Sequence, residues 1–407
     1  MRPRLLVCGW GMVLSSLLTA QAQIDPFKRE LVQLGYSQPL RGQGPISAYA
    51  FYYLNHPSFL RTNLTLRLAV APLYLDSELG FGKALGRETD FAIGVAGGGF
   101  ADTYSEVRGG KYFKEESFTG HGGGASASIY HRFNPQREIP LTGILRSEVH
   151  YSTYSRDSDT AAGFVMPDDR ASFNVRTGFR WGGREPLLLP SVGMELSGWY
   201  EGQFRGQSGS YGLANDREIK PNSHLFWARG LLTYTMPEWK HSFNVSLTFG
   251  TSVSSDRFSA YRLGDILPLA SEFPLALPGY YYQEISARRF VLLGGNYSIP
   301  LDRRQRWSFN MLAATAGVQY VTGLEQPGRW HSSLGGGITY RSPSDAWQLA
   351  LGYAYGVDAI RSQGRGAHSL GLLLQFDLER AHLPLFDRGA SPSWSRGLQH
   401  IFRSGNF

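Results

Sequence analysis

The chain has 407 residues, a formal net charge of +7, 49 glycines and 14% aromatic residues. Its basic side chains are scattered along the sequence, which excludes the clustered patch that a nucleic-acid-binding protein needs. Because the single cysteine is Cys8, the remainder of the chain has no disulfide and no cysteine-ligated metal. A soluble chain of this length would ordinarily form two domains, but the glycine and aromatic content favours a single β-barrel.

The N-terminal residues have the features of a secretory signal peptide. Arg2 and Arg4 precede an apolar stretch that ends at Leu18, and Ala20-Gln21-Ala22 fits a cleavage site between small residues. We expect residues 1–22 to be removed on export and residues 23–44 to form an N-terminal periplasmic segment. After Ala22 no run reaches about 18 apolar residues, the minimum for a membrane-crossing helix, so none is expected.

Alternating apolar and polar residues predict long strands with one lipid-facing side. In residues 171–181, Phe173, Phe179 and Trp181 share one face, whereas Arg176 and Arg180 lie on the other. Arginines at these positions exclude an ordinary protein core and are expected to face the barrel lumen. The strands extend over about ten residues, whereas strands of soluble proteins usually have five or six, so the pattern favours a transmembrane barrel.

We predict an all-β fold, a transmembrane antiparallel β-barrel of sixteen strands over residues 45–378, with fourteen strands as the alternative. An irregular tail, residues 379–407, follows. Two to four strands are expected within 45–88, and twelve more near residues 89–100, 122–133, 141–153, 171–182, 190–204, 225–236, 241–253, 288–300, 306–321, 328–341, 345–357 and 366–378. In residues 306–320 the apolar phase shifts, which indicates either a β-bulge or a strand with small residues on both faces.

The connections between these strands are of two kinds. Short polar turns such as residues 302–305 alternate with longer connections near 101–121, 154–170, 205–224 and 254–286. Bacterial outer-membrane barrels have short turns on the periplasmic side and long loops outside, and we expect the same arrangement here.

The sequence contains no recognisable catalytic or metal-binding constellation. It has no G-x-S-x-G element, and its ten histidines form no H-x-x-x-H or H-E-x-x-H pair. We therefore predict no catalytic, cofactor-binding or metal-ligating residues and expect that the protein is not an enzyme. A lipid-modifying outer-membrane enzyme is the least favoured alternative.

Residues 261–301 resemble part of the outer-membrane protein-assembly barrels, the family of BamA, TamA and related bacterial surface antigens. In that family an aromatic-x-Leu-Gly-Gly element leads into a long inward-folded loop with a (Val/Leu)-Arg-Gly-(Phe/Tyr) motif, and five strands complete a sixteen-strand barrel. The matching residues here are Tyr261, Leu263 and Gly264, then Leu277, Pro278, Gly279 and Tyr280, then Tyr297, Pro300 and Leu301. The resemblance implies an assembly or translocation barrel.

The chain departs from the family pattern in three places. Pro278 stands where the family has arginine, Asp265 replaces the second glycine, and the strand near 308–318 lacks the acidic partner of that arginine. Loss of both partners is physically coherent, because a lone buried charge is costly. The segment before the first strand is too short for one periplasmic POTRA domain, so the resemblance is to short members without them.

Two functions follow from these patterns. The first is an assembly or translocation barrel in which residues 254–286 either fold into the lumen and gate it or pack outside over its mouth. The alternative is a passive or anion-leaning porin-like channel with Arg176 and Arg180 in the lumen. The expected location is the outer membrane of a Gram-negative-type bacterium. The expected partners are its lipid, lipopolysaccharide and, during insertion, the barrel-assembly machinery; nucleic acid is not expected.

Overall fold

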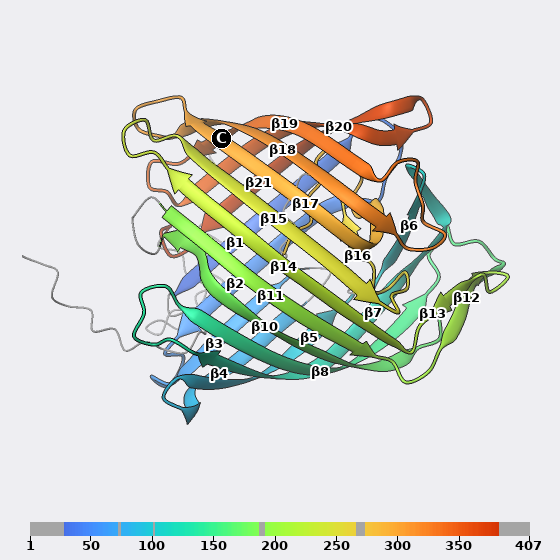
Figure 1. The fold of residues 1–407 in the computed structure, drawn as a ribbon, viewed down its shortest axis with the longest axis horizontal. Coiled ribbons are helices and arrows are strands. Elements are labelled where there is room, and N and C mark those ends of the chain that lie inside the picture. Colours follow the sequence, from blue (N-terminus) through green and yellow to red (C-terminus); the bar gives the residue numbers. More distant parts are fainter. Residues whose placement is uncertain (1–27, 72–74, 101, 187–191, 266–272, 382–407) are drawn as a thin grey trace, which may run out of the picture.

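The computed structural model describes residues 28–71, 75–100, 102–186, 192–265 and 273–381. The predicted signal peptide and most of the predicted tail lie outside these residues. The described chain forms a closed antiparallel barrel of sixteen tilted strands (Figure 1). Within it, no helix is long and apolar enough to cross a membrane.

Sixteen strands form the wall. In chain order they are β1 (Arg29–Pro39), β2 (Ser47–Pro57), β3 (Leu64–Val70), β4 (Leu75–Gly86), β5 (Thr89–Gly98), β7 (Lys111–Arg132), β8 (Leu141–Ser155), β10 (Arg170–Pro186), β11 (Val192–Phe204), β14 (Asn222–Thr235), β15 (Ser242–Val253), β17 (Ile285–Pro300), β18 (Trp307–Tyr320), β19 (Trp330–Arg341), β20 (Trp347–Arg361) and β21 (Gly364–Asp377). The connections hold β6 (Tyr104–Arg108), β9 (Phe164–Val165), β12 (Gly209–Leu213), β13 (Arg217–Ile219) and β16 (Tyr261–Leu263).

The barrel closes where its first and last strands pair, and we call this β1–β21 pair the seam. Residues 31–39 of β1 lie opposite residues 369–377 of β21 in an unbroken antiparallel register. Closure leaves no free strand edge, as a wall in lipid requires. β1 lies in the segment 23–44 that we expected to be periplasmic, so the predicted barrel start at residue 45 is wrong and the wall begins at Arg29.

The twelve strands predicted from residue 89 onward are all present, and β1 to β4 complete the predicted sixteen. Around Met311 and Leu312, β18 pairs with both β17 and β19 without a register shift, so the alternative with small residues on both faces is correct and a bulge at that place is wrong. The register shift between β17 and β18 lies near the loop end, opposite Gln319 and Tyr320. The inner row of β18 includes Leu312 and Ala314, and its outer row includes Met311 and Ala313.

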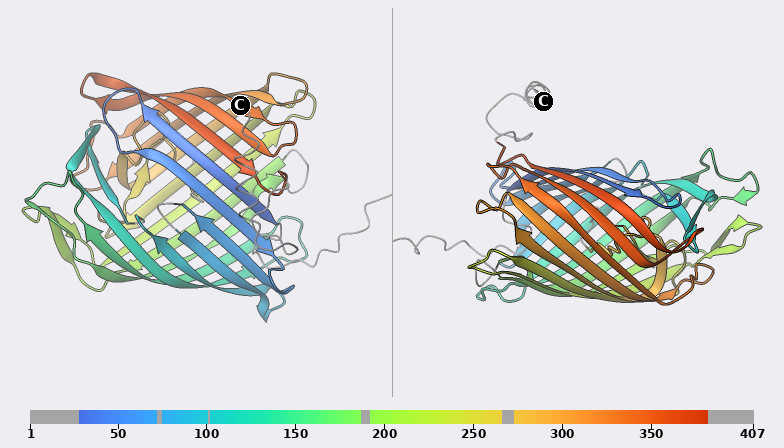
Figure 2. Two further views of the ribbon diagram at one scale, coloured as in Figure 1. Left: turned by 180° about the vertical axis from the view of Figure 1, so that it is seen from behind. Right: turned by 90° about the horizontal axis from the view of Figure 1, so that it is seen from above.

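The two ends of the barrel differ as the connection lengths predicted. The short connections 236–241, 301–306 and 342–346 lie at one end, the turn end, with the start of β1 and the end of β21. The long connections with the extra short strands lie at the other, the loop end (Figures 1 and 2). The outer face is apolar and uncovered by protein: Phe179 is 56% exposed and Leu351 is 56% exposed. Such a row suits a hydrocarbon environment.

Candidate functional site

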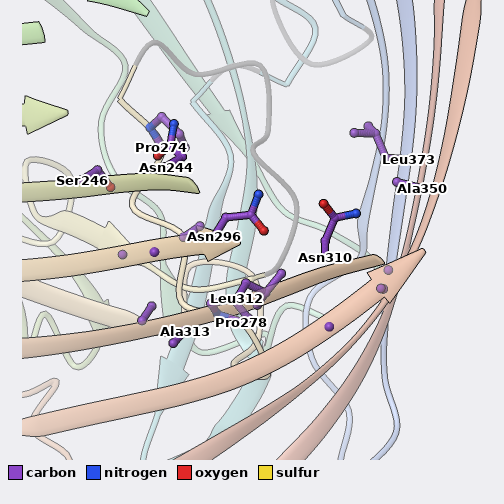
Figure 3. A pocket seen from close by; sticks show the side chains of 18 of the residues that line it. Asn244, Ser246, Pro274, Pro278, Asn296, Asn310, Leu312, Ala313, Ala350 and Leu373 are labelled. Carbon is purple, nitrogen blue, oxygen red and sulfur yellow. The ribbon is translucent and has the colours of Figure 1, made fainter. Parts of the chain in front are cut away.

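The connection between β15 and β17 folds into the barrel. After β16, the backbone N–H of Gly264 donates to the carbonyl of Leu275 at 3.1 Å, and Asp265 forms a β-bridge with Leu277. Pro274, Ala276 and Pro278 line a lumen cavity together with the inner faces of wall strands (Figure 3). The inward position is therefore correct for the described part of this connection. We call residues 273–284 the plug segment.

Phe273 holds the beginning of the plug segment against β11 and β14. Its ring meets Trp199 and Trp227 edge-on, with centroids 5.3 Å and 5.8 Å away, and the two indoles stack on each other. The Arg229 guanidinium lies 4.5 Å from the centre of the Phe273 ring. Aromatic and cation–π contacts of this kind stabilise a buried side chain beyond the area that it covers.

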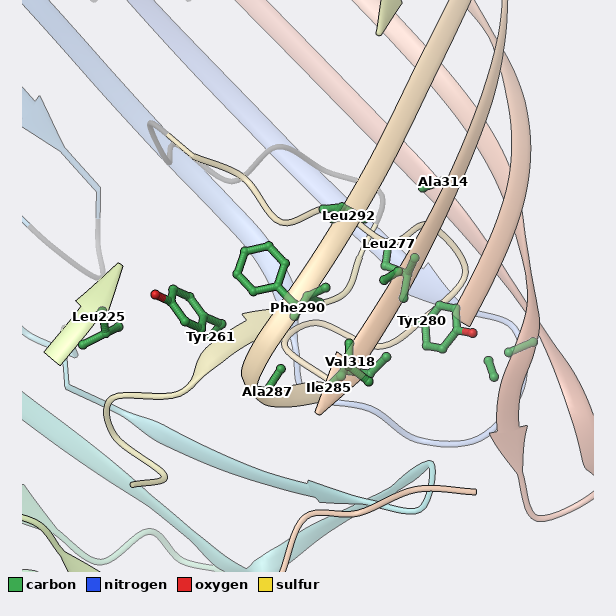
Figure 4. Close-up of a cluster of buried hydrophobic side chains, with 14 residues drawn as sticks. Leu225, Tyr261, Leu277, Tyr280, Ile285, Ala287, Phe290, Leu292, Ala314 and Val318 are labelled. Atoms are coloured by element: carbon green, nitrogen blue, oxygen red, sulfur yellow. The ribbon is translucent and has the colours of Figure 1, made fainter. Parts of the chain in front are cut away.

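The middle of the plug segment packs on β17, β18 and β20. Leu277 is fully buried, and Tyr280 lies in the same apolar cluster with residues of β17 and β18 (Figure 4). Gly279 has φ +87°, and a Cβ atom there would lie 2.1 Å from the backbone nitrogen of Gly356. Only glycine satisfies both this conformation and this approach. The close approach fixes the segment against β20.

The end of the plug segment is held by a buried ion pair that sequence analysis missed. Both terminal nitrogens of Arg361, on β20, donate to the carboxylate of Glu284 at 2.9 Å. Glu284 is 1% exposed and Arg361 is 4% exposed. The Tyr281 ring lies 3.6 Å from the same guanidinium. The two charged residues are 77 positions apart in sequence, so no local pattern could reveal the pair.

The first two motif elements taken from the family resemblance come together at this site, whereas the third, Tyr297, Pro300 and Leu301, lies at the turn end of β17. Leu263 is fully buried, and the hydroxyl of Tyr261 donates to the carbonyl of Phe226 at 2.9 Å. Both belong to the same apolar cluster as Leu277 and Tyr280. Pro278, in the place of the family arginine, lines the cavity. The buried ion pair of this chain has its acid, Glu284, on the loop and its arginine, Arg361, on the wall.

Arg176 and Arg180 lie on the inner face of β10 among acidic partners. Arg176 forms an ion pair with Glu201 at 2.7 Å, and Arg180 lies 3.8 Å from Glu195. Glu195 also accepts from Arg229. The network continues through β3, β4 and β8, where Arg67 pairs with Glu78 and Arg146 with Asp76. The arginines thus belong to a self-neutralising network and do not form a ring of uncompensated positive charge.

Apart from Arg229, the cavity beneath the plug segment is lined by uncharged residues. The cavity beneath the plug segment has a volume of about 540 Å³. Its polar side chains include Asn244, Asn296 and Asn310, with glycines from β17, β19, β20 and β21 between them. Asn310 lies three residues from the start of β18, so the cavity is near the turn end. The described residues contain no group of three or more histidine, aspartate or glutamate side chains placed to hold a metal.

The long connections at the loop end form a cap of their own. Tyr104, Phe118, Phe164, Tyr211 and Ile219 make a second apolar cluster, separate from that of the plug segment. Arg217 is buried beside it and pairs with Glu116, and burial lowers the pKa of Arg217 to about 10. The cap is therefore packed and charge-paired, and differs from freely solvated loops.

No protein-family model matches this sequence, and no curated protein matches it either. Among solved structures, the chain is similar to BamA from Haemophilus ducreyi lacking POTRA domains 1–3, with a TM-score of 0.56 and 10% identity over 86% of this chain and 70% of that one. It is also similar to CdiB from Acinetobacter baumannii (TM-score 0.54) and CdiB from Escherichia coli (TM-score 0.55), each at 10% identity over 86% of this chain.

This chain spans 60% of the Acinetobacter CdiB and 63% of the Escherichia CdiB, less than two thirds of either. At this level of identity the likeness shows the fold. The chain has the sixteen-strand barrel architecture of these outer-membrane proteins.

Proposed function

We propose that this chain is an outer-membrane barrel of the assembly or translocation type, in which the plug segment gates the lumen. The observation that carries the proposal is that this segment lies inside the barrel and is fixed at two separated places on the inner wall. Phe273 is held by β11 and β14, whereas Glu284 is held by β20, and four wall strands lie between these two sites. A loop fixed at separated points of the inner wall obstructs the passage between them.

The buried ion pair supports the same proposal. The family pattern places an arginine on the loop and an acid on the wall, and this chain has neither at those positions. It has instead a bidentate pair, Glu284 with Arg361, in a buried setting. Arginine and carboxylate in this geometry form one of the strongest polar contacts in proteins. A buried ion pair thus holds the loop in this chain too, with Glu284 and Arg361 in place of the residues of the family pattern.

An anion-leaning channel is the second candidate, and the charge network weakens it. Arg176 and Arg180 each have an acidic neighbour on β11, so they offer little uncompensated positive potential to an anion. A passive channel would also need an open path past the plug segment. Conductance separates the two candidates.

The proposal includes the location and the partners. The apolar outer face fits the outer membrane of a Gram-negative-type bacterium, with export through the signal peptide predicted for residues 1–22. Outer-membrane lipid and lipopolysaccharide would surround the wall, and the barrel-assembly machinery would insert it. The cargo of such a barrel would be another polypeptide.

Single-channel recording in planar bilayers tests the gating. The refolded chain without residues 1–22 should show at most brief openings. A variant that lacks residues 271–283 should conduct steadily, because it loses the segment that occupies the lumen. Deletion of residues 207–212 from the cap is the matched control and should leave the closed state unchanged. Steady conductance of the intact barrel, unaltered by the deletion, would favour the passive channel and overturn the gating.

A further inference from the structure

The plug segment also contacts both sides of the seam at the loop end. On the β1 side, the residues that connect β1 to β2 are Leu40 to Ile46. The hydroxyl of Tyr281 donates to the carbonyl of Arg41 at 3.2 Å. The Tyr281 ring lies so close to Gly44 that a Cβ atom there would be 2.5 Å from it. One aromatic side chain of the plug thus rests on the first hairpin of the barrel.

On the β21 side, the same ring touches the last hairpin. The Arg361 guanidinium, at the end of β20, stacks on Tyr281 with its central carbon 3.6 Å from the ring centre. β21 begins three residues later, at Gly364. The ring is therefore held between the β1–β2 connection and the β20–β21 hairpin, whose strands β1 and β21 form the seam.

A second contact ties the plug connection to the first hairpin. Asp265, next to β16, accepts a hydrogen bond from the hydroxyl of Ser47, the first residue of β2, and both side chains are buried. The seam itself continues to this end, where the backbone N–H of Leu40 donates to the carbonyl of His368. The contacts with the plug therefore lie next to the loop-end terminus of the seam.

We infer that Tyr281 is a latch that couples the plug to the seam, so that the loop end of β1 and β21 can separate only after the plug segment has moved. With the plug seated, separation of β1 from β21 would remove Tyr281 either from Gly44 or from Arg361. Loss of the ring removes this bridge and leaves the backbone pairing of the seam unsupported at its loop end. The latch is distinct from gating, because it concerns the wall and not the lumen.

Hydrogen exchange of the refolded barrel in lipid vesicles tests the latch. Tyr281→Ala should accelerate exchange of the β1 and β21 amides about tenfold, as expected for the loss of a desolvated cation–π contact. Amides of β11 and β14 should be unchanged. Phe273→Ala is the matched control: it releases the plug from β11 and β14 but does not touch the seam. Tyr281→Phe keeps the ring and should retain most of the protection.

Equal acceleration of the seam amides in the Tyr281→Ala and Phe273→Ala variants, or none in either, would overturn the latch. If Tyr281→Ala fails to give the compact, heat-modifiable form on a gel, Gly44→Ala provides the same test, because its Cβ atom displaces the ring while the ring remains present. Exchange is measured without cargo and without current, so this result stands apart from the conductance test of gating.

Discussion

Replacement of Glu284 by glutamine removes the charge that neutralises Arg361 and keeps the shape of the side chain. Breaking a buried ion pair from one side costs about 3–5 kcal/mol, since it leaves a buried charge without its counter-ion. Two features reduce this cost here. The amide oxygen still accepts one N–H, and the Tyr281 ring at 3.6 Å keeps a cation–π contact of about 1–2 kcal/mol. We expect Glu284→Gln to lower the free energy of unfolding by about 2–3 kcal/mol.

Urea titration of the barrel in lipid vesicles, followed by tryptophan fluorescence, measures this loss. The double variant Glu284→Gln/Arg361→Gln removes both charges, so it should be less destabilised than the single variant. Glu218→Gln, on an exposed glutamate of the cap, is the control and should change stability little. A loss below about 0.5 kcal/mol for Glu284→Gln, the size expected of an exposed pair, would refute the argument that this ion pair is buried. So would a double variant that is less stable than the single one.

Two further predictions concern the plug and a turn. Gly279→Val should unseat the plug and increase the open time in single-channel recordings. The reason is that a β-branched side chain is strained at φ +87° and would collide with Gly356. An unchanged open time would contradict this prediction. At the turn end, hydrogen bonds from the backbone, chiefly the N–H of Trp307, lower the pKa of Asp302 below its ordinary 3.8. The ionised Asp302 carboxylate should stabilise the turn fully above pH 3.8, and this stabilisation should be lost as the pH falls through the lowered pKa. Exchange of the Trp307 amide, corrected for its intrinsic rate, should rise at acid pH in the wild type and be faster at neutral pH in Asp302→Ala.

The strands could be predicted because their signal is local. Each long strand carries its outward apolar row within one stretch of sequence, as Phe173, Phe179 and Trp181 do, and lipid on that side imposes the pattern. β1 was not predicted because its outward row has only three apolar residues, Val32, Leu34 and Tyr36, before the polar Gln38. A run of three alternating apolar residues is too short to indicate a membrane-crossing strand. The place of β1 in the wall comes from pairing with β21, more than 300 residues away.

The site could be predicted only in part. The motif around Tyr261 and Gly279 located the loop, but not its position inside the lumen, which depends on contacts with β11, β14 and β20. The ion pair of Glu284 with Arg361 gave no sequence signal, because each residue alone looks like an ordinary solvated charge. Neither residue stands at one of the motif positions of the family resemblance, so a search for those motifs does not find the pair. Long-range pairing is the information that the sequence pattern lacks.

Accessibility of a cysteine beneath the plug tests the central claim most directly. The only natural cysteine, Cys8, lies in the predicted signal peptide, so Asn296→Cys would place a single thiol in the cavity under the plug segment. Glu218→Cys, on the exposed cap, reports labelling from outside. With a membrane-impermeant maleimide added to intact cells, we expect Glu218→Cys to react and Asn296→Cys to stay unlabelled unless residues 271–283 are deleted. Labelling of Asn296→Cys in the undeleted barrel as fast as Glu218→Cys would contradict a lumen closed by the plug.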